Sequence, residues 1–123
     1  MADSYGRSGG LVIALPADLI FGARIRAAAD GAGTNIIIAK NPDDVLNKAA
    51  DPETRLIILD LDRRGLNIAD LISRLKATSP ARILAYVSHV REDAIQEAKR
   101  AGADKVIARG AFANQLQELL KIY

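Results

Sequence analysis

Five short apolar runs, each of a length suited to a β-strand, alternate with segments of helical periodicity along this 123-residue chain. The runs cover residues 11–15, 34–39, 55–60, 82–87 and 105–108. Because each run is apolar almost throughout, both of its faces are expected to be covered, as in parallel strands packed between helices. Right-handed crossovers then give an open, doubly wound sheet. The sequence therefore predicts one α/β domain with a five-stranded parallel sheet, since five units are too few for an eight-fold barrel.

Helix boundaries are marked by capping residues. A first helix is expected over 19–29, closed by the glycine-containing segment 30–33, because glycine permits a left-handed cap. Asn41 can cap a second helix, whose first position suits Pro42, and Asn67 can cap a third. A last helix is predicted to bury one apolar side, formed by Phe112, Leu116, Leu119 and Leu120. These signals alternate with the strands as an α/β sheet requires.

Composition excludes several classes of protein. The chain has no Cys, so disulfides, thiolate nucleophiles and Cys-type metal sites are excluded. Residues 1–10 lack the apolar stretch of a signal peptide, and we predict a flexible tail there, followed by the domain over 11–123. No apolar run approaches the length of about 20 residues that crosses a bilayer. We therefore expect a cytoplasmic protein with no membrane segment.

Charge gives no indication of a nucleic-acid partner. The formal net charge is +2, and acidic and basic residues are interleaved, as in the segment 91–93. Nucleic-acid-binding domains usually gather Lys and Arg on one face. We expect a mixed, solvated surface and no nucleic-acid binding.

Ligand sites in doubly wound sheets lie at the carboxyl ends of the strands. In this chain those ends fall at residues 15–18, 39–41, 60–65, 88–90 and 109–111. The glycines at 31 and 33 follow a helix, and no glycine-rich phosphate loop ends in Lys-Ser or Lys-Thr. We therefore predict no nucleotide cofactor.

Four motifs occur in a characteristic order and spacing. They are an apolar strand ending in Asp60, the turn Gly65-Leu66-Asn67, the segment Ala101-Gly102-Ala103-Asp104, and Arg109-Gly110-Ala111-Phe112. With these motifs the chain resembles, from Leu11 to Tyr123, the receiver domains of response regulators. The resemblance implies a flavodoxin-like (βα)5 fold, and it makes Asp60 the equivalent of the phosphoacceptor aspartate. The last motif stands where the family has Lys-Pro-Phe, with one extra residue.

Departures from the receiver pattern affect the expected chemistry. Receiver phosphorylation needs a divalent cation held by an acidic pair after the first strand, and this sequence has Leu15-Pro16 there. Asp18 follows two residues later. We expect this residue to start the first helix rather than to bind the cation. The family's Lys is replaced by Arg109, which can hold an anion but is not a geometric equivalent. No metal site is therefore predicted.

The switch position of the family falls on Val87 or Ser88, and the sequence leaves both alignments open. Ser88 would retain the hydroxyl group, whereas Val87 would abolish it. His89 is the single histidine of the chain, which excludes a His-rich metal site. It is either a titrating switch or an exposed loop residue. A hydrolytic triad of Ser88, His89 and Asp60 is not expected, because the chain has no nucleophile elbow, and we predict no enzymatic activity.

Two carboxylates follow each other closely at the end of the third run. Asp60 and Asp62 would point to the same side if the strand continued through Leu61, and together they could hold a cation or a basic group. In the alternative, Asp60 caps nearby backbone and Asp62 is solvated. Asp60 is also expected to pair with Arg109 across the strand ends, which would fix one conformation.

The predicted function is that of a stand-alone, degenerate receiver-like domain that signals by protein contact without phosphorylation and without a cofactor. The alternative is a genuine receiver phosphorylated on Asp60, in which case magnesium would bind there. A weaker alternative is a small-molecule sensor at the strand ends. The expected contact face, for a protein partner or for self-association, is formed by the fourth helix, the fifth strand and the fifth helix. Its surface residues include Arg91, Gln96, Lys99, Lys105, Gln115 and Lys121.

Overall fold

Five parallel strands form one sheet in the order β2-β1-β3-β4-β5. The computed structural model describes residues 10–88 and 91–123. The strands are β1 (Leu11–Leu15), β2 (Asn35–Ile38), β3 (Thr54–Asp60), β4 (Arg82–Val87) and β5 (Lys105–Ala108). The helices are α1 (Leu19–Ala32), α2 (Pro42–Ala49), α3 (Ile68–Thr78), α4 (Glu92–Ala101), α5 (Arg109–Asn114) and α6 (Leu116–Ile122). The predicted doubly wound α/β fold is confirmed.

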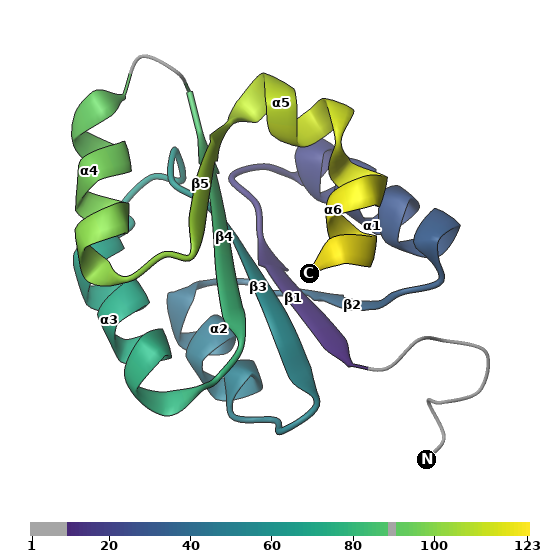
Figure 1. Cartoon of the computed structure of the whole chain (residues 1–123), viewed down its shortest axis with the longest axis horizontal. Coiled ribbons are helices and arrows are strands. Elements are labelled where there is room, and N and C mark those ends of the chain that lie inside the picture. The colour runs from purple at the N-terminus through teal and green to yellow at the C-terminus, as the bar shows by residue number, and fades with distance from the viewer. Residues whose placement is uncertain (1–9, 89–90) are drawn as a thin grey trace.

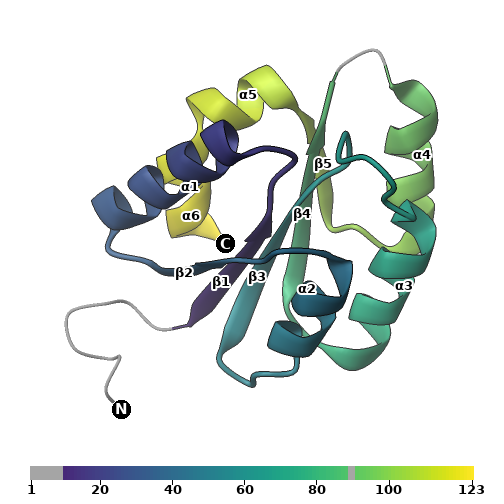
Figure 2. The same cartoon turned by 180° about the vertical axis from the view of Figure 1, so that it is seen from behind.

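Helices cover both faces of the sheet, as the continuous apolar strands require. Figures 1 and 2 show α2, α3 and α4 on one face and α1, α5 and α6 on the other. Successive residues of a strand point to opposite faces, so each strand contributes to two cores. On the α1 side, Phe21 and Phe112 pack with Ile58, Leu84 and Tyr86. The sheet is thus the middle of three layers.

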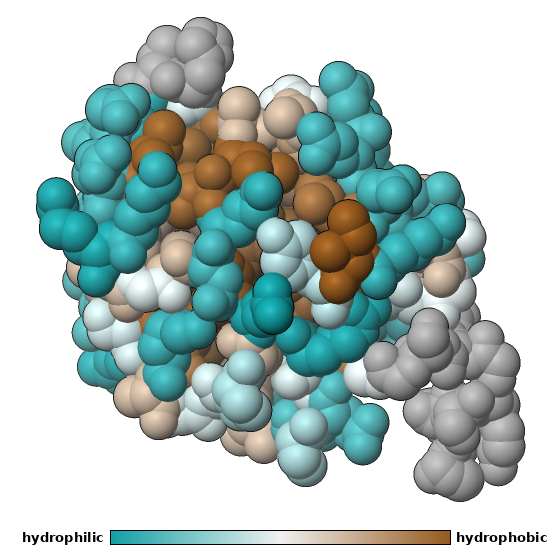
Figure 3. Space-filling view, viewed as in Figure 1, coloured by the Kyte–Doolittle hydropathy of each residue, from teal (hydrophilic) through white to brown (hydrophobic). Residues whose placement is uncertain are grey.

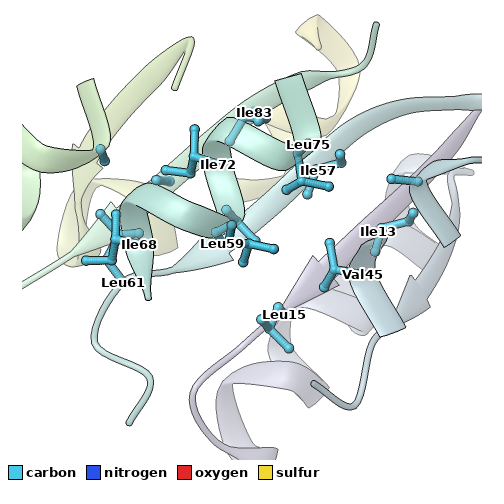
Figure 4. Packing of buried hydrophobic residues seen from close by; sticks show 14 of the residues in the cluster. Ile13, Leu15, Val45, Ile57, Leu59, Leu61, Ile68, Ile72, Leu75 and Ile83 are labelled. Atoms are coloured by element: carbon cyan, nitrogen blue, oxygen red, sulfur yellow. The ribbon is translucent and has the colours of Figure 1, made fainter. Parts of the chain in front are cut away.

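The larger of the two cores lies between the sheet and α2, α3 and α4. Figure 4 shows strand residues of this core, among them Ile13, Ile57 and Leu59, facing Val45 and Ile72 from the helices. Each of these side chains is at most 1% exposed. Full burial of one Leu or Ile side chain contributes about 1.5–3 kcal/mol to stability. A chain with so few aromatic residues therefore builds this core from branched aliphatic side chains.

The predicted caps of α2 and α3 are confirmed. The Asn41 side chain accepts a hydrogen bond from the Asp44 amide at 2.8 Å. The Asn67 side chain accepts one from the Asp70 amide at 3.2 Å. Each bond satisfies an amide that has no partner within its own helix, which fixes where the helix begins.

Two helix boundaries differ from the prediction. The first helix runs to Ala32, beyond 29, because Gly31 keeps a helical backbone and Gly33, with a φ of 67°, is the residue that adopts the left-handed cap. The single last helix is in fact two, α5 and α6. They are separated at Gln115, whose φ of −109° and ψ of 12° depart from helical values. The apolar residues predicted for that helix are still buried on one core.

Two expectations concern residues outside the described ranges 10–88 and 91–123. Apart from Gly10, the predicted tail lies outside the described residues, and so does His89. Within residues 10–88 and 91–123, no helix has the length and apolar character needed to cross a membrane.

Candidate functional site

Asp60 is the last residue of β3, and its side chain is completely buried at the carboxyl edge of the sheet. One carboxylate oxygen, Oδ1, accepts a hydrogen bond from the Asp62 amide at 2.9 Å. The other, Oδ2, accepts bonds from the Ala17 amide at 3.2 Å and from Nη2 of Arg109 at 3.0 Å. Both oxygens therefore have partners supplied by the protein.

Arg109 brings a positive charge into the same site, because it follows β5 directly and opens α5. Its Nη2 lies 3.0 Å from Oδ2 of Asp60, as expected for this pair from the sequence. The guanidinium also lies near two further carboxylates, at 3.9 Å from Oδ2 of Asp18 and 3.9 Å from Oδ2 of Asp62. One cationic group thus stands among three acidic side chains.

Aromatic rings support the guanidinium from the core side. The centre of the Arg109 guanidinium is 4.7 Å from the ring centroid of Phe21 and 5.8 Å from that of Tyr86. Tyr86 in turn stacks on Phe112, with 4.1 Å between centroids and an interplanar angle of 6°. Cation–π contacts favour a planar guanidinium over an ammonium group. The aromatic surface formed by these rings therefore suits the guanidinium of Arg109.

Asp62 is not solvated, contrary to one of the two alternatives for this residue. The strand ends at Asp60, and the chain turns so that Asp62 Oδ2 accepts bonds from the Ser88 amide at 2.9 Å and the Ser88 hydroxyl at 2.7 Å. Nη1 of Arg91 lies 3.5 Å from the other oxygen. Asp62 therefore ties the end of β3 to the end of β4.

Asp18 starts α1, as predicted. Its Oδ1 accepts a hydrogen bond from the Phe21 amide at 2.8 Å, which is a helix cap. Its second oxygen faces Arg109 at 3.9 Å. The residue thus combines a structural role in α1 with a place at the edge of the site.

Arg63 is a residue of the site that the sequence did not indicate. Its Nη1 donates to the Pro16 carbonyl at 2.8 Å and its Nη2 to the Lys40 carbonyl at 2.7 Å. These bonds join the loops that follow β1, β2 and β3. No local sequence signal predicts them, because they depend on how three loops come together in space.

Burial affects the protonation of two groups here. Loss of water raises the pKa of Asp60 above its ordinary value, although the Asp62 amide and the charge of Arg109 favour the ionised form. Burial, and then the negative charge of Asp60, raises the pKa of the Tyr86 hydroxyl. This hydroxyl is buried with no hydrogen-bond partner among the described residues.

The two candidate switch positions, Val87 and Ser88, fall on either side of the end of β4. Val87 is the last residue of β4 and is fully buried, whereas Ser88 follows it and directs its hydroxyl to Asp62. His89 lies outside the described residues, so its role stays a prediction. In the described part of the chain, no group of three or more His, Cys, Asp or Glu side chains is arranged to hold a metal ion.

Comparison with solved structures identifies the architecture. The signal receiver domain of a response regulator from Bermanella marisrubri superimposes with a TM-score of 0.80 and 21% identity, over 94% of this chain and 98% of that one. A response regulator from Thermotoga maritima gives 0.77 and 22%, over 94% and 97%. The chain has the receiver fold. No family model and no curated protein matches the sequence.

A third solved structure has the same fold. The receiver domain of a sensor histidine kinase from Pseudomonas aeruginosa, whose structure has magnesium coordinated in the active-site cleft, superimposes with a TM-score of 0.79 and 14% identity. The match covers 94% of this chain and 98% of that one. In this chain, the carboxyl edge of the receiver fold holds a guanidinium that contacts Asp60 directly.

Proposed function

We propose that this chain is a receiver-fold signalling domain that acts by protein contact and is not phosphorylated on Asp60. The proposal assigns no catalytic residue and no cofactor, and it sets the domain in the cytoplasm. The observation that carries it is the state of Asp60, a side chain that is 0% exposed and whose two oxygens both accept hydrogen bonds from the protein.

Attack on a phosphoryl group requires a carboxylate oxygen that can approach phosphorus in line with the leaving group. At Asp60, Oδ2 is held by Arg109 and Ala17, and Oδ1 by the Asp62 amide. Two of these donors are backbone amides, which cannot move away without moving their loops. The arrangement supports a structural role for Asp60.

A divalent cation has little support at this site. Magnesium prefers oxygen ligands in octahedral geometry, and it usually binds through one or two carboxylates. The residues after β1 are Leu15 and Pro16, and the guanidinium of Arg109 lies within 4 Å of Asp18, Asp60 and Asp62. A cation placed among these carboxylates would be repelled by Arg109. We propose that Arg109 supplies the positive charge for which a working receiver uses a metal.

The proposed contact face comprises α4, β5, α5 and α6. Figure 3 shows apolar surface between α4 and α5, over β5. Ile95, Val106 and Ile107 are half-buried members of these elements. Exposed polar side chains surround them, at Gln96, Lys99, Lys105, Gln115 and Lys121. Arg91, expected on the same surface, is half-buried and contacts Asp62. An apolar centre with a polar rim is the usual anatomy of a protein interface.

The test is phosphorylation of the purified chain by acetyl phosphate with magnesium, read by intact mass. Asp60→Asn serves as the site control, and a working receiver treated in parallel serves as the positive control. We expect no phosphoryl mass on this chain and no magnesium-dependent shifts of its amide resonances. A phosphoryl group that appears on the parent and is lost in Asp60→Asn would overturn the proposal.

The second candidate is a receiver that is phosphorylated on Asp60. Its supporting observations are the position of Asp60 at the end of β3 and the presence of a hydroxyl group after β4, at Ser88, which lies 2.7 Å from Oδ2 of Asp62. In that case the Arg109–Asp60 contact would have to break during transfer. Phosphorylation of Arg109→Ala but not of the parent would identify Arg109 as the group that blocks the reaction.

A further inference from the structure

The hydroxyl group of Tyr86 is buried without a hydrogen bond. Tyr86 is 0% exposed, and its hydroxyl is the one buried side-chain polar atom that has no partner in the described part of the chain. A buried donor with no acceptor destabilises a fold. Phenylalanine would place the same ring on Phe112 without that loss. Packing of the ring therefore does not account for the hydroxyl group.

Tyr86 and Asp60 lie side by side on the same face of the sheet. They are partner residues in the parallel pairing of β3 with β4. Ile58 and Leu84, two residues before them on the same strands, belong to the same core as Tyr86, as the alternation of side chains requires. Burial raises the pKa of the Tyr86 hydroxyl, and the charge of Asp60 raises this pKa further, so the hydroxyl keeps its proton. A donor without a partner thus stands beside a buried acceptor.

Other donors occupy the carboxylate of Asp60. Oδ2 accepts hydrogen bonds from Nη2 of Arg109 at 3.0 Å and from the Ala17 amide at 3.2 Å. A carboxylate oxygen has about two acceptor sites, so both sites of Oδ2 are taken. The Ala17 amide is part of the backbone, whereas Arg109 is a side chain that is 31% exposed. Arg109 is therefore the donor that can leave Asp60.

A displaced Arg109 has a second carboxylate to pair with. Its Nη2 lies 3.9 Å from Oδ2 of Asp18, a side chain that is 58% exposed. Oδ1 of Asp18 accepts the bond from the Phe21 amide, so the cap of α1 does not depend on Arg109. Outward movement thus transfers the guanidinium from a buried carboxylate to an exposed one. An exposed ion pair contributes little to stability, which explains why the inward position is the one observed.

We propose that Arg109 and Tyr86 are alternative hydrogen-bond donors to Asp60. In the observed state Arg109 binds the carboxylate, and the Tyr86 hydroxyl makes no bond. In the second state the guanidinium pairs with Asp18, and the hydroxyl donates to Asp60 in its place. Asp60 accepts a side-chain hydrogen bond in both states, so the buried carboxylate is not left unpaired when Arg109 moves.

The exchange of donors connects the buried site to α5. Arg109 is the first residue of α5, which belongs to the proposed contact face. A partner carboxylate that binds only the outward guanidinium shifts the equilibrium toward the second state, because it has a higher affinity for that state. This last step rests on the proposed function, whereas the exchange at Asp60 does not.

A double-mutant cycle tests whether the two donors replace each other. Urea unfolding would be measured for the parent, Tyr86→Phe, Arg109→Ala and the double variant. In the parent, loss of the hydroxyl should not raise the unfolding equilibrium constant, because the hydroxyl makes no bond there. In Arg109→Ala, the same loss should raise this constant about tenfold, since it removes a hydrogen bond to a charged group. If Arg109→Ala does not fold, Arg109→Met replaces it, because methionine keeps a long side chain beside the Phe21 ring.

Arg100→Ala provides the matched control, since Arg100 is exposed on α4. Tyr86→Phe should have no effect on unfolding in that background. NMR relaxation dispersion tests the second state in the parent itself, where the Arg109 and Gly110 amides should show exchange that is about tenfold weaker in Tyr86→Phe. Equal effects of Tyr86→Phe in the parent and in Arg109→Ala, or α5 amides without such exchange, would overturn the proposal. Either outcome would leave the proposed function standing, because the phosphorylation test does not involve Tyr86.

Discussion

The guanidinium of Arg109 reaches the completely buried carboxylate of Asp60, with 3.0 Å between Nη2 and Oδ2, while Arg109 itself is 31% exposed. The pair thus links a carboxylate in the protein interior to a side chain at the surface. A buried carboxylate is destabilising unless its charge is matched, so the two residues are expected to depend on each other energetically.

Arg109→Ala should lower the free energy of unfolding at pH 7. The change leaves Asp60 buried without its nearest cation and removes the contacts with Phe21 and Tyr86. Loss of one partner from a buried pair typically costs 3–5 kcal/mol, and the partial exposure of Arg109 reduces the expected loss to about 1–3 kcal/mol. Urea unfolding followed by circular dichroism measures this difference.

Arg100→Ala is the matched control for that experiment. Arg100 is an exposed residue of α4, and removal of such a side chain usually changes stability by less than about 0.5 kcal/mol. Equal stability of the two variants would show that the Arg109–Asp60 pair contributes little, and it would remove the main support for an occluded Asp60.

The pH dependence of stability should change in Asp60→Asn. Burial raises the pKa of Asp60 above its ordinary value of 3.8, so the folded state binds this proton more tightly than the unfolded state. Stability from this group is therefore fully present below the ordinary pKa and is lost as pH rises through the folded-state pKa. Relative to Asp60→Asn, the parent should become less stable as the pH rises from the ordinary pKa of 3.8 through the higher folded-state pKa, by about 1.4 kcal/mol for each unit of pKa shift.

The control for this titration is Gln96→Asn, a change at an exposed position of α4. It removes no titratable group, so its pH profile should follow that of the parent. If the Asp60→Asn profile also ran parallel to the parent's, the pKa of Asp60 would be the same in the folded and unfolded states, and burial would not dominate its ionisation.

The fold could be predicted from the sequence because its signals are local. The runs at 82–87 and 105–108 coincide with β4 and β5, and Asn41 and Asn67 cap the helices that they were expected to cap. Strand periodicity and capping depend on neighbouring residues alone. The pairing of Asp60 with Arg109 also followed, since parallel strands bring their carboxyl ends to one edge.

The rest of the site depends on contacts between residues that lie far apart in the sequence, and no local pattern predicts such contacts. Phe21, Tyr86 and Phe112 come from three distant segments, and their common contact with one another appears only in the packed core. Arg63 reaches two loop carbonyls whose positions depend on the loops themselves. The break between α5 and α6 at Gln115 could not be predicted either. The apolar periodicity of the sequence continues through this residue, whereas its backbone dihedral angles depart from helical values.

Alanine substitutions at two glycines should have opposite effects. Gly33 caps α1 with a φ of 67° and has open space around the position of a Cβ atom, so only backbone strain opposes alanine there. Gly33→Ala should cost about 1–2 kcal/mol. Gly110 lies within α5 and also has open space, so Gly110→Ala should stabilise the protein by about 0.5–1 kcal/mol. Equal effects in urea unfolding would contradict the assigned backbone conformations.

Tyr86→Phe should not destabilise the protein. The Tyr86 hydroxyl is buried with no hydrogen-bond partner in the described part of the chain, whereas its ring stacks on Phe112. Phenylalanine keeps the stacked ring and removes the unpaired hydroxyl, so the free energy of unfolding should stay equal or rise by about 1 kcal/mol. Tyr86→Leu, which also loses the ring, should be clearly less stable. A loss above about 1 kcal/mol in Tyr86→Phe would instead indicate a hydrogen bond from this hydroxyl, with Asp60, its neighbour across the strands, as the acceptor.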